Sequence, residues 1–395
     1  AASMDMLLAA AVTVALGAYA LHLFGVAGSW ALPVAFAAAG LAALAKGPLG
    51  LVLPGLVVAG FAVAVRDLQP LRLALHPRGL LVLLLVAAPW YAAIFADQGR
   101  HFVDVFLLNH NVSRFTSTVH NHPGPVVYYV PVLLAGLFPS SGLVVLAFSG
   151  LRPRANQAQM FLLLWLVLPL AFFSLAGSKL PGYILPCLPP LALLMGRAAA
   201  RLMDREGNAD APAEPPRVAL RTAALIGLAL GALLAAGPFV LRSQGEPAWA
   251  SVLPAGVWAL LIALAVARRL GSDPAGALRM LRVGGAGFLL LLALAAPPLL
   301  ARRESGRALF ATTQGREVLV LGAWRTAWMA GYFYNDGRVR EIGDLSEVVR
   351  AARAGPALVL CGPSERRQIE GLSELTVLVL AEGPRRNVLL RVELR

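Results

Sequence analysis

The sequence has few charged residues and few cysteines. Only 14% of its 395 residues are Asp, Glu, Lys or Arg, whereas soluble globular proteins contain about 25%. This shortage excludes an ordinary soluble domain for most of the chain. The two cysteines, Cys187 and Cys361, lie far apart in apolar surroundings. Their spacing excludes a disulfide framework and a cysteine-based metal motif.

Common short motifs are also absent, and acidic residues are scarce. No His-Glu-x-x-His motif occurs, and no Gly-x-Gly-x-x-Gly follows a predicted strand, so neither a zincin nor a dinucleotide-binding domain is indicated. The 21 acidic residues are outnumbered by 34 Lys and Arg, giving a net charge of +13. Because the arginines cluster between apolar runs, they are typical of cytoplasmic loops at a membrane. We therefore predict membrane lipids, and no nucleic acid, as partners.

Long apolar runs are what the sequence has in abundance. A bilayer is spanned by roughly 17–25 apolar residues, and we identify ten candidate spans. They are 5–24, 29–45, 48–65, 80–97, 126–149, 160–176, 181–197, 218–240, 249–267 and 283–301. These runs predict a polytopic α-helical membrane domain over residues 1–301. Gly227 and Gly231 form a Gly-x-x-x-Gly pair, which indicates close helix packing.

Positive charge alternates between the loops that join these spans. One set of loops holds most of the arginines: Arg66, Arg72, Arg78, Arg152, Arg154, Arg197, Arg201, Arg205, Arg217, Arg268, Arg269, Arg279 and Arg282. The opposite set holds only Lys46, Arg100, Arg114, Lys179 and Arg242. Since the arginine-rich side of a membrane protein is cytoplasmic, we expect Asp5, Lys46, residues 98–125, the turn 178–181 and the C-terminus to share the outer face.

The composition changes after Ala301. Short apolar runs at 316–321, 357–361, 375–380 and 387–393 predict buried strands, and residues 344–353 and 364–370 predict amphipathic helices between them. We therefore expect residues 302–395 to form a small α/β domain outside the membrane.

Residues 98–125 form a polar segment between two apolar spans. They contain four of the six histidines, His101, His110, His120 and His122, together with Arg100, Asp104 and Arg114. The histidines could serve as ligands of a divalent metal, with His110 and His122 as candidates, as donors to a phosphate, or as interfacial polar residues. Arg114 follows His110 by one helical turn, so both side chains could face one site.

The outer face also gathers the cations that a phosphate would need. Lys46, Arg100, Arg114 and Lys179 are candidates for binding it, although Lys46 could simply snorkel and Arg100 could anchor the interface. Tyr183 follows Lys179 in a Lys-Leu-Pro-Gly-Tyr turn that breaks the helix. It is a further candidate for binding the phosphate, and the alternative is a place in the aromatic belt. Tyr128, Tyr129, Trp90 and Tyr91 are expected in the belt. The outer carboxylates are few: Asp5, Asp97, Asp104 and Glu246. Of these, Asp97 is expected to cap a helix or contact water rather than act as a base.

Six stretches together resemble the undecaprenyl-phosphate aminoarabinose transferase family, within the C-type glycosyltransferase superfamily that includes the protein O-mannosyltransferases. They are SMDMLLA (3–9), LAKGPLGLVLPG (44–55), APWYAAIF (88–95), NHNVSRF (109–115), HPGPVVYYVPVLLAGLFP (122–139) and FFSLAGSKLPGYILPCLPPLALLM (172–195). The order of these stretches and the α/β domain that follows them also match. The resemblance covers essentially the whole chain.

The resemblance implies an inverting sugar transfer from a polyprenyl phosphate donor to a lipid or glycolipid acceptor, on the periplasmic face of a bacterial inner membrane. In the best-known members the sugar is 4-amino-4-deoxy-L-arabinose and the acceptor is a phosphate of lipid A. The family pattern assigns Lys179, Tyr183 and the basic residues around Arg114 to the donor phosphate, and His110 to a metal position.

The chain departs from the family pattern in two ways. Members carry further spans and a periplasmic loop with the presumed catalytic Asp before the stretch that resembles 3–9, and this sequence enters an apolar run directly. We therefore expect an upstream segment to hold the catalytic Asp, with Asp5 as the candidate inside this chain. Many relatives also read Glu-His where this chain has Asn109-His110, and aromatic pairs where it has Val126-Val127, which leaves the metal and the donor sugar open.

Two other classes of protein fit part of the pattern. A transporter or lipid flippase would also have many spans with scattered Gly and Pro, but transporters bind their substrates near the bilayer midplane. A membrane scaffold that displays the C-terminal domain would not need His, Arg, Lys and Tyr gathered on one face. A membrane glycosyltransferase therefore remains the preferred prediction.

Overall fold

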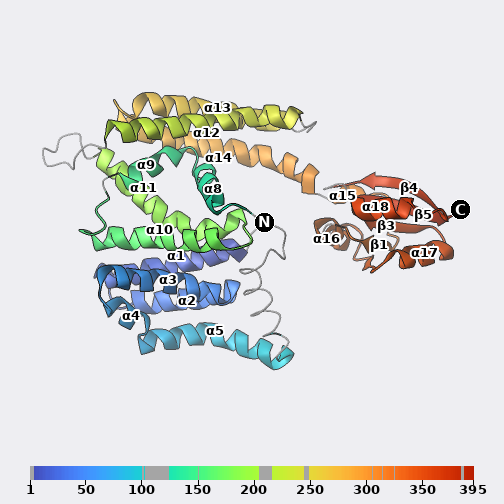
Figure 1. The fold of residues 1–395 in the computed structure, drawn as a ribbon, viewed down its shortest axis with the longest axis horizontal. Coiled ribbons are helices and arrows are strands. Elements are labelled where there is room, and N and C mark those ends of the chain that lie inside the picture. Colours follow the sequence, from blue (N-terminus) through green and yellow to red (C-terminus); the bar gives the residue numbers. More distant parts are fainter. Residues whose placement is uncertain are drawn as a thin grey trace. The chain divides into compact units, whose positions relative to one another are not determined.

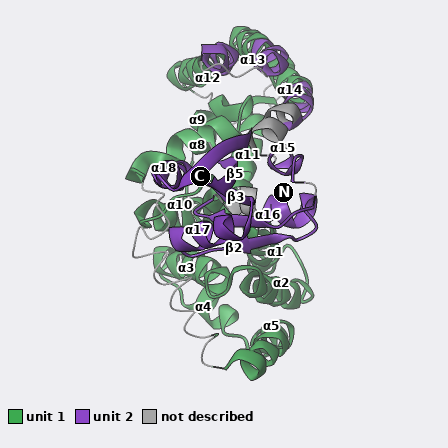
Figure 2. Ribbon diagram, turned by 90° about the vertical axis from the view of Figure 1, so that its right-hand side faces the viewer, with its two compact units in different colours: residues 1–233, 259–285 green, residues 234–258, 286–395 purple. Residues whose placement is uncertain are grey.

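The structure is a computed structural model that describes residues 4–99, 102, 124–149, 151–203, 216–243, 249–304, 306–313, 315–323, 325–383 and 387–395. It consists of two compact units, which Figure 2 colours separately. The first comprises Ala1–Leu233 and Ala259–Gly285, and the second comprises Leu234–Trp258 and Ala286–Arg395. The predicted domain boundary at residue 301 stays a prediction.

The first unit is helical, and Figure 1 shows its helices. In chain order they are α1 (Met4–Leu23), α2 (Ala31–Lys46), α3 (Leu49–Val65), α4 (Gln69–Ala74), α5 (Pro77–Gln98), α8 (Tyr129–Gly136), α9 (Leu143–Phe148), α10 (Gln157–Leu175) and α11 (Leu188–Met203). Three short 3-10 helices lie among them: η2 (Val126–Tyr128), η3 (Ser140–Gly142) and η4 (Pro181–Cys187). The long helices α12 (Arg217–Ser243), α13 (Trp249–Arg269) and α14 (Pro274–Glu304) each contribute to both units.

Seven helical segments in the described part of the chain are long and apolar enough to cross a bilayer. They are Met4–Leu23, Pro77–Gln98, Gln157–Leu175, Pro181–Met203, Arg217–Ser243, Trp249–Arg269 and Pro274–Ala295. Three shorter apolar segments accompany them: Ala31–Lys46, Leu49–Val65 and Val126–Gly136. The protein is therefore a multi-pass α-helical membrane protein, as expected, and the count of ten spans stays a prediction.

The predicted span 126–149 is wrong as a single helix. The chain forms α8, then η3, and then α9, with a break around Pro139. Proline supplies no backbone N–H, and the Ser-Ser-Gly that follows Pro139 favours a turn over a helix. Ser141 stabilises the break, because its hydroxyl donates a hydrogen bond of 2.5 Å to the carbonyl of Leu134.

An aromatic cluster fixes the direction of α1 in the first unit. Phe161 of α10 stacks on Tyr19 and meets Phe61 edge-on, with the two ring centres 5.3 Å apart in the second pair. The buried hydroxyl of Tyr19 donates a 2.5 Å hydrogen bond to the carbonyl of Pro70. The C-terminal part of α1 is thereby tied to α4, which carries Arg72 and follows Arg66, so Asp5 lies at the opposite end of α1.

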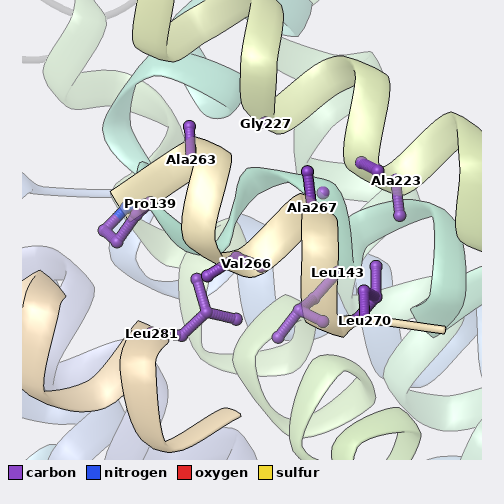
Figure 3. Close-up of a pocket in the computed structure, with 11 residues that line it drawn as sticks. Pro139, Leu143, Ala223, Gly227, Ala263, Val266, Ala267, Leu270 and Leu281 are labelled. Carbon is purple, nitrogen blue, oxygen red and sulfur yellow. The ribbon is translucent and has the colours of Figure 1, made fainter. Parts of the chain in front are cut away.

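Small residues allow close approach among α9, α12 and α13, as the Gly-x-x-x-Gly pair predicted. A Cβ added to Gly231 would lie 2.7 Å from the Cβ of Ala263, whereas one added to Gly227 would meet nothing within 4 Å. Gly227 instead lines a small apolar pocket (Figure 3). Its other lining residues are Pro139, Gly142, Leu143, Ala223, Ala224, Ala263, Val266, Ala267, Leu270 and Leu281.

The C-terminal part of the chain forms a five-stranded sheet. Its strands are β1 (Val318–Leu321), β2 (Val339–Glu341), β3 (Ala357–Cys361), β4 (Leu375–Glu382) and β5 (Val388–Leu394), in the order β2-β1-β3-β5-β4. β1 runs parallel to β2 and β3, whereas β5 runs antiparallel to β3 and β4. The four predicted strands are confirmed, and β2 is an addition.

Helices cover both faces of this sheet, which explains its continuous apolar strands. One face packs against α17 (Leu345–Ala354) and α18 (Pro363–Glu370) through Val348 and Ile369. The other face packs against α15 (Arg307–Phe310) and α16 (Arg325–Tyr334) through Leu309, Phe310 and Ala330. Both predicted helices are confirmed, while α15 and α16 were not predicted.

We expect Leu360→Ala to destabilise the sheet by about 2–5 kcal/mol, because Leu360 is fully buried in β3 and its removal leaves a cavity. Leu378→Ala in β4 is the matched control, since Leu378 is 57% exposed, and it should cost less than about 1 kcal/mol. Hydrogen exchange of the sheet amides in the detergent-solubilised full chain measures both. Equal losses of protection would contradict this packing.

The stability of α17 should depend on pH through Asp344. The Ser346 hydroxyl and then the Glu347 backbone N–H donate to this carboxylate and hold its pKa below the usual range. Because the folded pKa is depressed, the stabilisation is present at neutral pH and is lost as the pH falls below about 4. Asp344→Asn should keep the cap but remove its titration. Hydrogen exchange measured against pH should then show that protection of the α17 amides falls less at acidic pH in the variant than in the parent chain.

Candidate functional site

The site is built around an ion pair between the ends of two neighbouring helices. Asp5 lies in the first turn of α1, and Lys46 is the last residue of α2. Both positions suit the helix dipole, which favours an anion at the N-terminus and a cation at the C-terminus. The Lys46 ammonium donates a short hydrogen bond to the Asp5 carboxylate, and each side chain is 20% exposed. A partly buried pair of this kind is screened less by salt than a surface pair.

A turn between α10 and α11 carries the third member of the site. Tyr183 of η4 places its ring under Lys46, with the Lys46 Nζ 4.3 Å from the ring centre, which is a cation–π contact. The ring of Phe173 also lies against Tyr183, at 5.5 Å between centres. Gly182 lets this turn approach α1, because a Cβ there would lie 3.0 Å from Oδ2 of Asp5.

Lys179 lies on the same turn and is 7% exposed. Its Nζ donates a 2.7 Å hydrogen bond to the carbonyl of Ala176, just after the end of α10. A lysine near a helix C-terminus satisfies the last carbonyls in this way, and an ammonium has two further N–H donors. Gly124 lies against Lys179, since a Cβ there would be 3.1 Å from the Lys179 Cδ. The described end of the polar segment 98–125 therefore meets this turn.

Tyr129 is a further residue of this region, and its expected place in the aromatic belt is wrong. The side chain is fully buried at the start of α8, and its ring meets that of Tyr128 edge-on at 5.0 Å. Its hydroxyl lies beside the backbone of Leu180, within electrostatic reach of Asp5 and Tyr183. It makes no hydrogen bond of good geometry to any described residue. The sequence offered no signal for this, because Tyr128 and Tyr129 are adjacent and chemically alike.

Tyr91 is also more than a belt residue. Its hydroxyl donates a 2.8 Å hydrogen bond to the carbonyl of Ala43 in α2, one turn before Lys46. Trp90 meets Tyr91 edge-on at 5.0 Å and remains 44% exposed, which suits the belt. Tyr91 thus ties α5 to the helix end that carries Lys46.

Asp5, Lys46, Tyr129, Lys179 and Tyr183 form what we call the Lys46 cluster. Sequence analysis predicted that Asp5, Lys46, Lys179 and Tyr183 share one face. The structure brings Asp5, Lys46 and Tyr183 into contact, and it places Lys179 on the same turn as Tyr183. The cluster contains two cations, one carboxylate and two phenols. With one excess positive charge and several N–H and O–H donors, this arrangement suits an anion such as a phosphate.

The remaining site predictions fall on residues outside the described ones. Arg100, Arg114, His110 and His122 all lie there, as does Asp104. Among the residues that the structure describes, no group of three His, Cys, Asp or Glu side chains could hold a metal ion. A divalent metal at His110 or His122 therefore stays a prediction.

Comparison with known proteins gives a consistent set of relatives, although no protein-family model matches the chain. The chain is 39% identical over 230 residues to the undecaprenyl phosphate-α-4-amino-4-deoxy-L-arabinose arabinosyl transferase of Pseudomonas aeruginosa (strain UCBPP-PA14), covering 56% of this chain and 40% of the relative. It is 38% identical over 200 residues to the transferase of the same name from Pectobacterium carotovorum subsp. carotovorum (strain PC1). That match covers 50% of this chain and 34% of the relative.

A solved structure extends the similarity to nearly the whole chain. The crystal structure of ArnT from Cupriavidus metallidurans bound to undecaprenyl phosphate matches with a TM-score of 0.74 and 23% identity, over 98% of this chain and 74% of that chain. The same protein in the apo state matches equally well. The resemblance expected from the sequence is therefore confirmed: this chain is similar in sequence to the undecaprenyl phosphate-aminoarabinose arabinosyl transferases and has the ArnT fold.

Proposed function

We propose that this protein is an integral-membrane glycosyltransferase that moves a sugar from a polyprenyl phosphate donor to a lipid acceptor. The single observation that carries the proposal is the Lys46 cluster, which gathers cations and hydroxyls at one end of the helices. Two further findings support it. The curated relatives are named as arabinosyl transferases, and the ArnT structure with the same fold is described as bound to undecaprenyl phosphate.

The cluster would act on the phosphate of the donor. When the acceptor attacks the anomeric carbon, the bond from that carbon to the phosphate oxygen breaks and negative charge grows on the phosphate. Fixed cations and hydrogen-bond donors stabilise that charge in the transition state. We assign this role to Lys46, Lys179 and Tyr183, with Arg100 and Arg114 as further donors from the polar segment.

An acceptor that attacks through a hydroxyl group also needs a base to take its proton, whereas a phosphate oxygen is already ionised. Asp5 is the carboxylate of the Lys46 cluster, but it is already engaged in the ion pair with Lys46. We therefore propose that Asp5 offsets the positive charge of Lys46 and does not act as the base. The general base is then a carboxylate outside the described residues, as the family resemblance implied.

The names of the relatives and the family resemblance support a proposal for the sugar, the acceptor and the cellular location. We propose 4-amino-4-deoxy-L-arabinose as the sugar, lipid A as the acceptor, and the periplasmic face of the bacterial inner membrane as the location. The distribution of arginines supports this orientation, because arginine-rich loops face the cytoplasm. Tyr19 bonds to Pro70 beside the arginine-rich loops, whereas Asp5 lies at the opposite end of α1. Arg201, another member of the arginine-rich set, donates a hydrogen bond to the carbonyl of Ser149.

The transporter alternative is not favoured. Transporters bind substrates near the bilayer midplane between broken helices. In the described part of the chain, Asp5 and Lys46 occupy helix ends, and Lys179 and Tyr183 occupy the turn after α10. This position suits a reaction at the membrane surface.

We expect Lys46→Ala to weaken binding of undecaprenyl phosphate to the purified chain in nanodiscs by tenfold or more. A hydrogen bond to a charged group contributes about 1.5–3 kcal/mol, and about 1.4 kcal/mol corresponds to tenfold. Tyr183→Phe keeps the ring under Lys46 and removes only the hydroxyl, so it should have a smaller effect. Arg72→Ala is the matched control, because it removes one positive charge at the arginine-rich end. Equal binding by Lys46→Ala and Arg72→Ala would overturn the assigned site.

Asp5→Asn should tighten binding of undecaprenyl phosphate by several-fold. The substitution removes a negative charge from beside the phosphate and releases Lys46 from its ion pair. Titration calorimetry at two salt concentrations checks this, since the gain should shrink as salt screens the charges. Weaker binding would show that Asp5 contributes to the site in some way other than by neutralising Lys46.

A further inference from the structure

Helix α16 of the sheet domain exposes an apolar face. Met329, Tyr332 and Phe333 are spaced three and four residues apart, so they lie on one side of the helix. Their exposed fractions are 52%, 54% and 80%. The ring of Tyr334 packs edge-on against Phe333, at 4.9 Å between centres. A helix on the surface of a soluble domain normally presents polar residues outward, so an exposed apolar cluster of this kind marks an interaction surface.

Contacts of Gly331 and of Asn335, the residue directly after α16, hold the helix in place, so it cannot rotate to bury its aromatics. Asn335 is 2% exposed, and its side-chain amide donates 2.9 Å hydrogen bonds to the carbonyls of Arg316 and Arg338. Its amide oxygen accepts a 2.7 Å hydrogen bond from the Thr313 hydroxyl. Gly331 lies against Phe310 of α15, because a Cβ there would come 2.9 Å from the Phe310 ring. The exposure of Met329 and Phe333 is therefore built into the domain.

The covalent chain keeps α16 close to a membrane span. The candidate span Pro274–Ala295 continues in α14 to Glu304, and α15 begins at Arg307. At a rise of 1.5 Å per residue, the stretch from Ala295 to Glu304 covers about 14 Å. The headgroup region on one side of a bilayer is roughly 5–8 Å thick. Since α15 packs on α16, the apolar face lies within reach of the lipid interface.

The charge of this part of the chain suits an anionic lipid surface. Residues 302–340 contain seven arginines and three carboxylates, and each basic residue near an anionic membrane adds to its attraction. Tyr, Phe and Met beside arginine are also the residue types found at membrane interfaces. We infer that α16 docks the sheet domain onto the bilayer by placing Met329, Tyr332 and Phe333 among the headgroups of anionic phospholipids.

Depth-dependent quenching in the reconstituted full chain tests this inference. Phe333→Cys is labelled with an environment-sensitive fluorophore in vesicles of phosphatidylcholine with phosphatidylglycerol, where some lipids carry a nitroxide near the headgroup. We expect the nitroxide lipids to quench this label several-fold more than a label on Arg350→Cys, an exposed position on α17. Removing phosphatidylglycerol should reduce the difference. The parent chain gives the background labelling, because Cys187 and Cys361 are buried.

Two results would overturn the inference. Equal quenching at positions 333 and 350 would mean that α16 does not enter the interface. A label at 333 that is shielded from aqueous iodide but untouched by the nitroxide lipids would mean that protein, and not lipid, covers this face. Neither result bears on the Lys46 cluster, so the inference and the proposed function can fail separately.

Discussion

The ion pair between Asp5 and Lys46 is the constraint around which the membrane part of this protein is arranged. Two charges that are only one-fifth exposed must be paired where they lie, because an isolated buried charge is costly. This requirement fixes the start of α1 beside the end of α2. It also fixes the turn after α10, whose Tyr183 ring lies under the same ammonium and whose Gly182 leaves room for the carboxylate. Three segments distant in sequence thereby meet at one charged group.

The helices around this pair hold its two side chains in position through hydrogen bonds to the backbone. Tyr19 ties the far end of α1 to Pro70, and Tyr91 ties α5 to Ala43, one turn before Lys46. Both phenols use a backbone carbonyl as acceptor, which keeps a polar group satisfied without a second side chain. The hydroxyl of Tyr129, in contrast, makes no good hydrogen bond to a described residue. Like the two further N–H groups of Lys179, it is a donor that a ligand could still satisfy.

The sequence predicted the convergence at the site better than the contacts within it. Alternating arginine loops were enough to place Asp5, Lys46, Lys179 and Tyr183 on one face, because each span reverses the direction of the chain. Which side chains pair depends on which helices are neighbours, and apolar composition does not encode this.

The effect of proline on the helices was also not predictable from the sequence. Pro54, Pro89 and Pro169 lie inside continuous helices, whereas the helix breaks at Pro139, where Ser-Ser-Gly follows. Strand β2 was missed because it has three residues, two of them charged. The arginines and histidines expected from residues 98–125 lie outside the described residues.

The charge balance of the Lys46 cluster has a consequence for turnover under the proposed function. The donor is a phosphodiester with one negative charge, whereas the released lipid phosphate is a monoester that carries between one and a half and two charges near neutral pH. Because the Asp5 carboxylate offsets one of the two cations, the difference between the affinities for the donor and for the released phosphate is smaller than it would be with two unpaired lysines. Under the proposed function, Asp5 would thereby limit product inhibition, because it would keep the released lipid phosphate from binding much more tightly than the donor that must replace it. The same carboxylate that weakens binding of the donor would therefore speed release of the product.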